Sequence, residues 1–486
     1  MKPVTQQSCI ELARLLRESK ISPTELANEY IDQIERLNPL LNALIDFDAE
    51  RVREQARAAE RSKAPHGPLF GLPMTIKASI SVAGYRCEIG SLINRGNTPA
   101  EDATLVARLR KAGATILGPS NTPEFLMAYE TDNRLYGRSN NPWNLAYTPG
   151  GSSGGESAAI AAGLSPAGFG SDSGGSVRVP AHFTGICSLK PTPGRIPRTG
   201  HLPGCVGPFA ILGAIGPMAR TIDDVSLLFK VLSGQDPVDP VSPPVPYRAA
   251  SLADVKPLRV GYFEDDGLIP VTPETRQAVQ DAVRALQRNG LDVRPFRPKA
   301  LEQARKLWWT FFVRCGAMFV RSLVRGQESA LSPILQEFLQ IAETEPLLTA
   351  DELLNAWAEC DVIRGTLLEQ MQEYPVLLCP VCSIPAFRHG ERQWQIEGQA
   401  VEYLDVMRYT QWFNLLAAPA AVVPVGRSPE GLPIGIQIVA RPFQDEIALA
   451  VASVIDHEFG YATPPIALGA TPWPAQPNAE SDPVLG

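Results

Sequence analysis

Residues 148–197 read TPGGSSGGESAAIAAGLSPAGFGSDSGGSVRVPAHFTGICSLKPTPGRIP. The stretch holds two glycine-flanked serine clusters, at residues 150–155 and 172–176, separated by small residues typical of a packed helix. Glycine at these places lets the backbone bend tightly and lets a ligand come close. A site that stabilises a developing oxyanion with backbone N–H groups requires both properties. The stretch therefore predicts such a site.

A lysine upstream belongs to the same pattern. Lys77 follows the apolar run at residues 72–76, which is typical of a buried strand, so a charged amine there is costly without partners. A serine hydroxyl is a poor nucleophile until a base takes its proton. A lysine can be that base only where burial and neighbouring donors lower its pKa.

Together, these clusters, the segment GLPMTIKASI at residues 71–80 and the LKPT segment at residues 189–192 resemble the amidase signature family of serine hydrolases. The resemblance covers most of residues 1–235 and about 375–460. It implies that Ser176 is the nucleophile, that Ser152 passes the proton, and that Lys77 is the base. It also implies a cis peptide between Gly151 and Ser152, a geometry that is costly outside proline and tends to mark function.

The resemblance implies further roles around the nucleophile. An oxyanion hole would be formed by the backbone N–H groups of Ser173, Gly174, Gly175 and Ser176. Asp172 and Arg178 flank the nucleophile, and we expect them to form a buried ion pair that holds the turn in shape. Leu126 and Met127 are expected in the substrate pocket. The chemistry implied needs no metal and no cofactor.

Two other kinds of site share parts of the pattern. Residues 151–155 also fit G-x-S-x-G, the nucleophile elbow of α/β-hydrolases, which would make Ser153 the nucleophile. That alternative needs a strand directly before the elbow, but residues 140–149 are typical of a loop, and it needs a late histidine such as His389 or His457. No Lys-Ser or Lys-Thr follows either cluster as a phosphate-binding loop requires, and S-x-x-K does not occur.

Composition limits the class of protein. With 486 residues, 44% hydrophobic and 20% charged, the chain is typical of a soluble globular protein. A net charge of −8 argues against a nucleic-acid partner. The N-terminus lacks an apolar signal region and no run of about 18 apolar residues follows, so we expect a cytoplasmic location and no membrane span. Eight scattered cysteines indicate reduced thiols, and Cys379 with Cys382 is interpreted as a buried strand end rather than a zinc or redox pair.

Alternating helices and short apolar strands predict an α/β fold, and the resemblance implies a central mixed β-sheet covered by helices on both faces. Helices are predicted at residues 10–19, 23–37 and 104–112, and strands at 114–117 and 258–262. We divide the chain into an N-terminal part with the signature core (1–235), a proline-rich linker (236–250), a C-terminal part of the same domain (251–465) with a variable helical pocket region (300–373), and an extended tail (466–486).

The segment at residues 307–324 is rich in aromatic residues with arginines between them. Such a helix can lie on a membrane surface. We favour a core helix that also lines the pocket for the acyl group.

Two departures from the family pattern bear on the substrate. Ala78 and Ser79 follow Lys77 where many members carry an acidic residue, so the hydrogen bonding around the lysine can differ. The alternative function is the glutaminase subunit of an aminoacyl-tRNA amidotransferase, which works with a partner chain and holds glutamine with an acidic residue. Met407 falls at that position, which favours a neutral and more apolar substrate.

The expected activity is thus hydrolysis of amides with a hydrophobic or aryl acyl part through an acyl-enzyme, with esters and carbamates as further substrates. The expected partners are a small amide and water. A homodimer and a non-catalytic scaffold stay open as alternatives.

Overall fold

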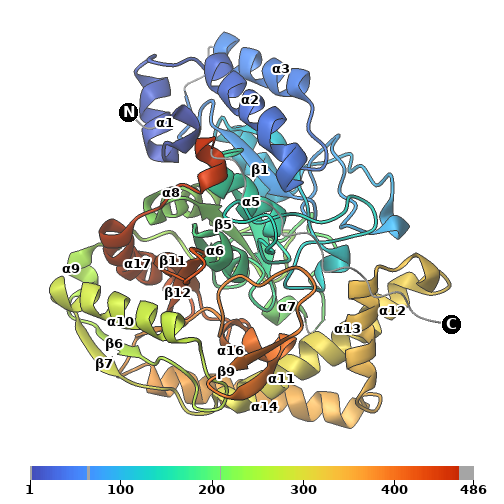
Figure 1. The fold of residues 1–486 in the computed structure, drawn as a ribbon, viewed down its shortest axis with the longest axis vertical. Coiled ribbons are helices and arrows are strands. Elements are labelled where there is room, and N and C mark those ends of the chain that lie inside the picture. The colour runs from blue at the N-terminus through green and yellow to red at the C-terminus, as the bar shows by residue number, and fades with distance from the viewer. Residues whose placement is uncertain (1–2, 63–65, 208, 470–486) are drawn as a thin grey trace.

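A ten-stranded mixed sheet runs through the molecule, with helices on both of its faces (Figure 1). The computed structural model describes residues 3–62, 66–207 and 209–469. Within them the strand order is β2-β1-β3-β5-β4-β11-β12-β8-β6-β7. These strands are β1 (Pro73–Lys77), β2 (Thr115–Ser120), β3 (Ala167–Asp172), β4 (Cys187–Lys190), β5 (Ala214–Ala219), β6 (Arg259–Tyr262), β7 (Asp292–Pro295), β8 (Val376–Pro380), β11 (Ala420–Arg427) and β12 (Pro433–Ala440). The predicted α/β class with a central mixed sheet is confirmed.

The two halves of the chain meet inside this sheet, because β4 pairs antiparallel with β11. The parallel pairs lie near the two edges, β1 with β2 and β3 on one side and β6 with β7 and β8 on the other. In the first group Lys77 lies beside Ser120 in register. A small antiparallel hairpin, β9 (Gln393–Ile396) and β10 (Gln399–Glu402), lies apart from the sheet.

The proline-rich stretch at residues 236–250 is anchored to the N-terminal half. Asp236 is buried, and its carboxylate accepts hydrogen bonds from the hydroxyls of Thr104 at 2.6 Å and Thr199 at 2.7 Å. Asp239 is also buried and accepts from the backbone N–H of Arg198. These bonds tie the first residues of the stretch to the N-terminal half, and near its end the backbone N–H of Arg248 donates to the carboxylate of Glu446 at 3.0 Å.

The predicted helices are present with shifted ends. Ser22 caps α2 through a capping box, and α2 runs past the predicted end at residue 37 to Leu41 because Leu37 and Leu41 continue its buried stripe past Pro39. The helices are α1 (Cys9–Arg17), α2 (Pro23–Leu41), α3 (Ala49–Arg61), α4 (Thr104–Lys111), α5 (Gly154–Ala162), α6 (Arg178–Thr184), α7 (Phe209–Leu212), α8 (Ile222–Leu232), α9 (Leu252–Val255), α10 (Pro273–Arg288), α11 (Leu301–Trp308), α12 (Cys315–Val324), α13 (Pro333–Glu343), α14 (Ala350–Gln370), α15 (Tyr403–Val406), α16 (Arg408–Leu415) and α17 (Asp445–Phe459).

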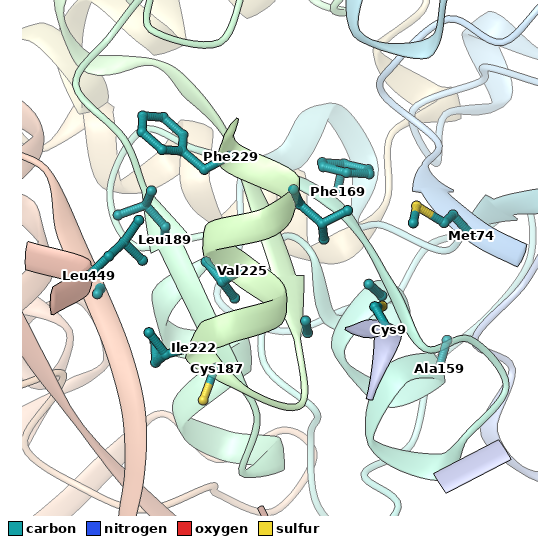
Figure 2. Packing of buried hydrophobic residues seen from close by; sticks show 14 of the residues in the cluster. Cys9, Met74, Ala159, Phe169, Cys187, Leu189, Ile222, Val225, Phe229 and Leu449 are labelled. Atoms are coloured by element: carbon teal, nitrogen blue, oxygen red, sulfur yellow. The ribbon is translucent and has the colours of Figure 1, made fainter. Parts of the chain in front are cut away.

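The main core lies between the sheet and these helices (Figure 2). Phe229 of α8, Leu189 of β4 and Leu449 of α17 belong to one buried cluster that also takes in Met74 of β1 and Phe169 of β3. Burying a side chain of this size contributes about 1.5–3 kcal/mol. The cluster therefore fixes β1 and β3, the two strands that end at the candidate site.

The aromatic segment predicted as one helix is interrupted. Between α11 and α12, residues Trp309–Arg314 form a π-helical turn, a feature that is frequent at functional sites. By length and composition, Leu301–Val324 could cross a membrane, but Trp308, Phe311 and Val320 are fully buried in a cluster with α13 and α14. The core-helix prediction fits this packing.

At the C-terminus, Pro465–Leu468 form a 3₁₀ turn. The rest of the predicted extended tail lies almost entirely outside the described residues.

Candidate active site

Lys77 and Ser152 are joined in the interior of the protein. Lys77 is the last residue of β1 and is fully buried. Its Nζ donates to the Oγ of Ser152 at 2.7 Å and to the Oγ of Ser171 at 3.1 Å. Burial lowers the pKa of Lys77 to about 7, although the carboxylates of Asp172 and Glu156 act in the opposite direction. A buried amine with this pKa can accept a proton near neutral pH.

The peptide between Gly151 and Ser152 is cis, as predicted. Gly151 packs so tightly that a Cβ there would lie 2.5 Å from the backbone oxygen of Glu130. The neighbouring backbone N–H of Ser153 donates to the oxygen of Ser176 at 3.2 Å. This bond ties the first serine cluster to the second.

The carbonyl groups of the second cluster are held by side chains from distant segments. The indole N–H of Trp308 donates to the oxygen of Ser173 at 2.9 Å. The hydroxyls of Tyr129 and Thr410 donate to the oxygen of Gly174 at 2.7 and 2.6 Å. The orientation of each peptide is therefore fixed from its carbonyl side.

The N–H groups of the same loop divide into two sets. The N–H of Gly175 donates to the carboxylate of Asp172 at 2.8 Å. Those of Ser173, Gly174 and Ser176 have no acceptor among the described residues. Gly175 has a φ of +126° and a Cβ there would lie 2.4 Å from the hydroxyl oxygen of Thr410, so the loop needs glycine at this position. Of the four backbone N–H groups expected in the oxyanion hole, those of Ser173, Gly174 and Ser176 are therefore available to donate to an oxyanion.

Asp172 and Arg178 form a fully buried ion pair at 3.0 Å. Burial by itself would raise the pKa of Asp172, but the charge and hydrogen bonds of Arg178 hold it well below its usual range. Asn414 donates to the same carboxylate at 2.9 Å, and Arg178 donates to Gln437 at 3.0 Å. Residues of α16 and β12 thus hold the turn that carries Ser176.

Two cavities meet at Ser176. The first has a mostly apolar lining of Leu126, Met127, Ala128, Tyr129, Gly174, Ser176, Trp308, Phe312, Val313, Ile334, Glu337, Phe338, Ile341, Tyr403 and Leu404. The second is lined by Phe125, Leu126, Met127, Ser152, Ser171, Ser173, Ser176, His201, Pro203, Gly204, Cys205, Phe312 and Phe319. The structure places Leu126 and Met127, the two expected pocket residues, in the walls of both.

The stretch that supplies Leu126 is strained. Phe125 and Leu126 have φ values of +49° and +67°, a region that costs non-glycine residues about 1–3 kcal/mol each and is found mainly at functional sites. The carboxylate of Glu124 just before them accepts from the hydroxyl of Ser91 and from the N–H of Ser332, the residue that begins α13. These bonds hold the strained turn against the cavities.

The Ser176 hydroxyl has no hydrogen bond to Ser152 in the described part of the chain, although both residues line the second cavity. The link between Lys77 and Ser152 is formed, and the link expected between Ser152 and Ser176 is not. We expect this second bond to form when substrate binds, because catalytic hydrogen bonds often tighten only then.

Sequence reasoning missed one hydrogen-bond partner of Lys77, Ser171, and one buried carboxylate that acts on it through its charge, Glu156. Ser171 lies on β3 directly before Asp172, and both its hydroxyl oxygen and its carbonyl oxygen accept hydrogen bonds from the Nζ of Lys77. Glu156 of α5 is fully buried and accepts from Thr75 and, at 2.6 Å, from Ser120. Burial raises the pKa of Glu156 to about 7. The signal available in the sequence was a glutamate, Glu156, among the small apolar residues of a helix expected to be buried.

The α/β-hydrolase alternative does not fit the geometry. Ser153 is fully buried, lines neither cavity, and its hydroxyl points to the oxygen of Ser171 at 3.4 Å. No strand precedes it over residues 140–149. His457 is exposed on α17 beside Asp223, and His389 lines neither cavity. Cys379 and Cys382 are both buried, as expected for a strand end.

Known proteins resemble this chain along nearly all of its length. The amidase family model matches residues 25–449. An acylamidase of Rhodococcus erythropolis is 35% identical, covering 92% of this chain and 94% of the relative. A glutamyl-tRNA(Gln) amidotransferase subunit of Roseiflexus castenholzii is 34% identical, covering 93% and 95%. A crystal structure of a bacterial aryl acylamidase of the amidase signature enzymes superposes with a TM-score of 0.84 and 25% identity, covering 94% of this chain and 97% of that one.

Proposed function

Because the chain belongs to the amidase family and is therefore an amide-hydrolysing enzyme, we propose that it cleaves amides with a hydrophobic or aryl acyl part through an acyl-enzyme on Ser176. The observation that carries this proposal is the buried contact of Lys77 with Ser152 at 2.7 Å, at the edge of a cavity that also exposes Ser176. A lysine with a pKa of about 7 can begin a proton relay without a histidine.

In the proposed reaction the Oγ of Ser176 attacks the amide carbon. Its proton moves to the Oγ of Ser152, whose own proton moves to neutral Lys77. The tetrahedral oxyanion accepts hydrogen bonds from the free N–H groups of Ser173, Gly174 and Ser176, and removal of one such donor costs about 2.7–4 kcal/mol of barrier.

The collapse of this intermediate breaks the C–N bond. Lys77 returns its proton through Ser152 to the leaving nitrogen, so an amine departs and the acyl group stays on Ser176 as an ester. Water then attacks the ester with the same relay as base, the acid departs, and Ser176 regains its proton.

The walls of the first cavity support a neutral acyl group. Trp308 and Phe312 stack there with ring centroids 4.8 Å apart. The acidic side chain in its lining is Glu337, which is paired with Arg392 at 2.9 Å. An apolar wall gives an aryl or alkyl acyl group more burial than it gives the charged backbone of glutamine.

The glutaminase alternative rests on the similarity to amidotransferase subunits. Met407, which stands where such a glutaminase is expected to carry an acid, is fully buried and lines neither cavity. The cavity therefore presents no unpaired carboxylate from this position to hold an ammonium group.

Labelling with a fluorophosphonate, followed by intact-mass measurement and peptide mapping, tests the nucleophile. We expect one adduct on Ser176 in the wild type and none in Ser176→Ala. An adduct on Ser153 would contradict the proposal. Hydrolysis of phenylacetamide, anilides, p-nitrophenyl esters and glutamine then tests the substrate class, and turnover of glutamine alone would favour the amidotransferase function.

A further inference from the structure

We infer that the second cavity receives the amine part of the substrate and that the enzyme accepts N-substituted amides whose amine carries an uncharged aryl group. This inference rests on the relay proposed above and concerns the half of the substrate that the relay leaves undefined.

The direction of the amide follows from the position of Ser152. This serine lines the second cavity and not the first. In the relay it must give a proton to the leaving nitrogen, so that nitrogen has to face Ser152. The acyl substituent diverges from the nitrogen at the tetrahedral carbon and is directed to the first cavity, beside Gly174 and Trp308.

The size of the second cavity exceeds what ammonia needs. The space in it that the centre of a water-sized sphere can reach is about 40 Å³, whereas a single water needs about 10–15 Å³ by the same measure. A primary amide, which releases ammonia, would leave most of this space unused.

The lining favours an aromatic group without charge. Phe125, Phe312 and Phe319 supply three rings, Pro203 adds apolar surface, and no Asp, Glu, Lys or Arg occurs among the described lining residues. Rings packed against rings at their edges or faces contribute about 0.5–1.5 kcal/mol beyond the area buried.

The two titratable residues of this wall, His201 and Cys205, are neutral. His201 donates from Nδ1 to the oxygen of Pro203 at 3.0 Å, and its Nε2 lies 3.3 Å from the hydroxyl of Ser79. Burial and the charge of Lys77 lower the pKa of His201 to about 3, and burial raises the pKa of the Cys205 thiol. Neither side chain offers a charge to a cationic amine.

Gly204 provides a way to fill this cavity selectively. It lies in the wall, has no positive φ, and a Cβ there would meet only the Cγ1 of Val206, at an ordinary distance of 3.7 Å. Ile334 of α13 lines the first cavity and not the second. Gly204→Phe and Ile334→Trp each enlarge a residue that lines one cavity and not the other. Gly365→Phe on the exposed face of α14, where a Cβ also meets open space, is the matched control.

The test measures kcat/KM for acetanilide, which has a small acyl group and an aryl amine, and for phenylacetamide, which has an aryl acyl group and releases ammonia. We expect Gly204→Phe to lower the ratio of kcat/KM for acetanilide to kcat/KM for phenylacetamide at least about tenfold. Ile334→Trp should raise this ratio by a similar factor. Pocket contacts of this size typically discriminate between substrates to this extent. Gly365→Phe should leave the ratio unchanged. A ratio that Gly204→Phe leaves unchanged or raises overturns the inference.

A comparison on the unaltered enzyme avoids any folding defect of the variants. The amine of N-benzylacetamide is about as basic as ammonia, so its kcat/KM against that of acetamide reports binding of the ring rather than leaving-group chemistry. We expect an increase of at least about tenfold for the benzyl compound. A decrease overturns the assignment of the cavity while primary amides are still cleaved, whereas absence of turnover on all amides and of labelling on Ser176 refutes the proposed function itself.

Discussion

The Nζ of Lys77 and the Oγ of Ser152 lie 2.7 Å apart, and 0% and 1% of the two residues' surfaces are exposed. No carboxylate forms an ion pair with this amine at 4 Å or less within the described residues, and its hydrogen-bond partners are two serines. Transfer of a charged amine to such a place is costly, so the neutral form is favoured. This contact supports the proposal that Lys77, rather than His201 of the same cavity wall, is the base of the relay.

Replacement of Lys77 by methionine should remove this base while it preserves the shape of the interior. We expect kcat/KM for an amide to fall about 10²–10⁴-fold, the usual range for a general acid–base group. Lys77→Arg should be equally impaired because a guanidinium stays protonated. Steady-state kinetics measure the loss, circular dichroism controls for the fold, and a variant with a tenth of wild-type activity would rule the base out.

The pH dependence of the rate should report the same residue. With a pKa of about 7, Lys77 is protonated and inactive below pH 7 and neutral above it, so kcat/KM should rise with pH through a midpoint near 7 and then level off. A midpoint near 10 would mean that the amine is not desolvated.

Stability should follow pH in a related way. Because burial holds the pKa of Lys77 below its value in the unfolded chain, the unfolded state binds more protons than the native state between about pH 7 and 10.5. This residue therefore makes the free energy of unfolding increase with pH across that window. The urea midpoint of the wild type minus that of Lys77→Met should therefore be larger at pH 9.5 than at pH 7. A difference that stays constant would show that Lys77 titrates normally.

The charge of Glu156 should raise the pKa of Lys77. Its carboxylate is charged above about pH 7 and favours the protonated form of Lys77. Glu156→Gln keeps an acceptor for Ser120 and removes the charge, so the midpoint of the kcat/KM profile should move to lower pH. Glu50→Gln on the exposed face of α3 is the control, and a shift to higher pH would contradict the electrostatic role.

The ion pair of Asp172 and Arg178 should be needed for the fold around Ser176. Arg178→Met leaves a buried carboxylate without its cation, which costs about 3–5 kcal/mol. We expect Asp172→Asn combined with Arg178→Met to be less destabilising than the sum of the single changes, because no charge is then left unpaired. Urea unfolding of the three variants measures this, and simple additivity would show that the two side chains act independently.

Local requirements of the backbone were predictable from the sequence. Glycine at 151 and 175 marks places where no side chain fits, and the apolar run before Lys77 indicates a buried strand. These features depend on neighbours in the chain, so the burial of Lys77 could be expected from them, whereas the cis peptide was expected from the family resemblance.

Contacts between distant segments could not be predicted in the same way. Tyr129, Trp308 and Thr410 reach the carbonyls of Ser173 and Gly174 only because the sheet and helices bring them there. No pattern in the sequence around these three residues indicates that they contact the loop. The π-helical turn after Trp308 was also missed, because one extra residue per turn does not disturb an apolar segment whose residues are hydrophobic on several faces.

Ser152 should matter more for amides than for esters. The leaving amine must receive a proton as the C–N bond breaks, and Ser152 is the group placed between Lys77 and the cavity assigned to that amine. An aryl oxide leaves without this help. Ser152→Ala should therefore lower kcat/KM for phenylacetamide about tenfold or more beyond its effect on p-nitrophenyl phenylacetate, which has the same acyl group. Equal losses on the two substrates would assign Ser152 to activation of Ser176 alone, and a larger loss on the ester would exclude it from proton delivery to the leaving group.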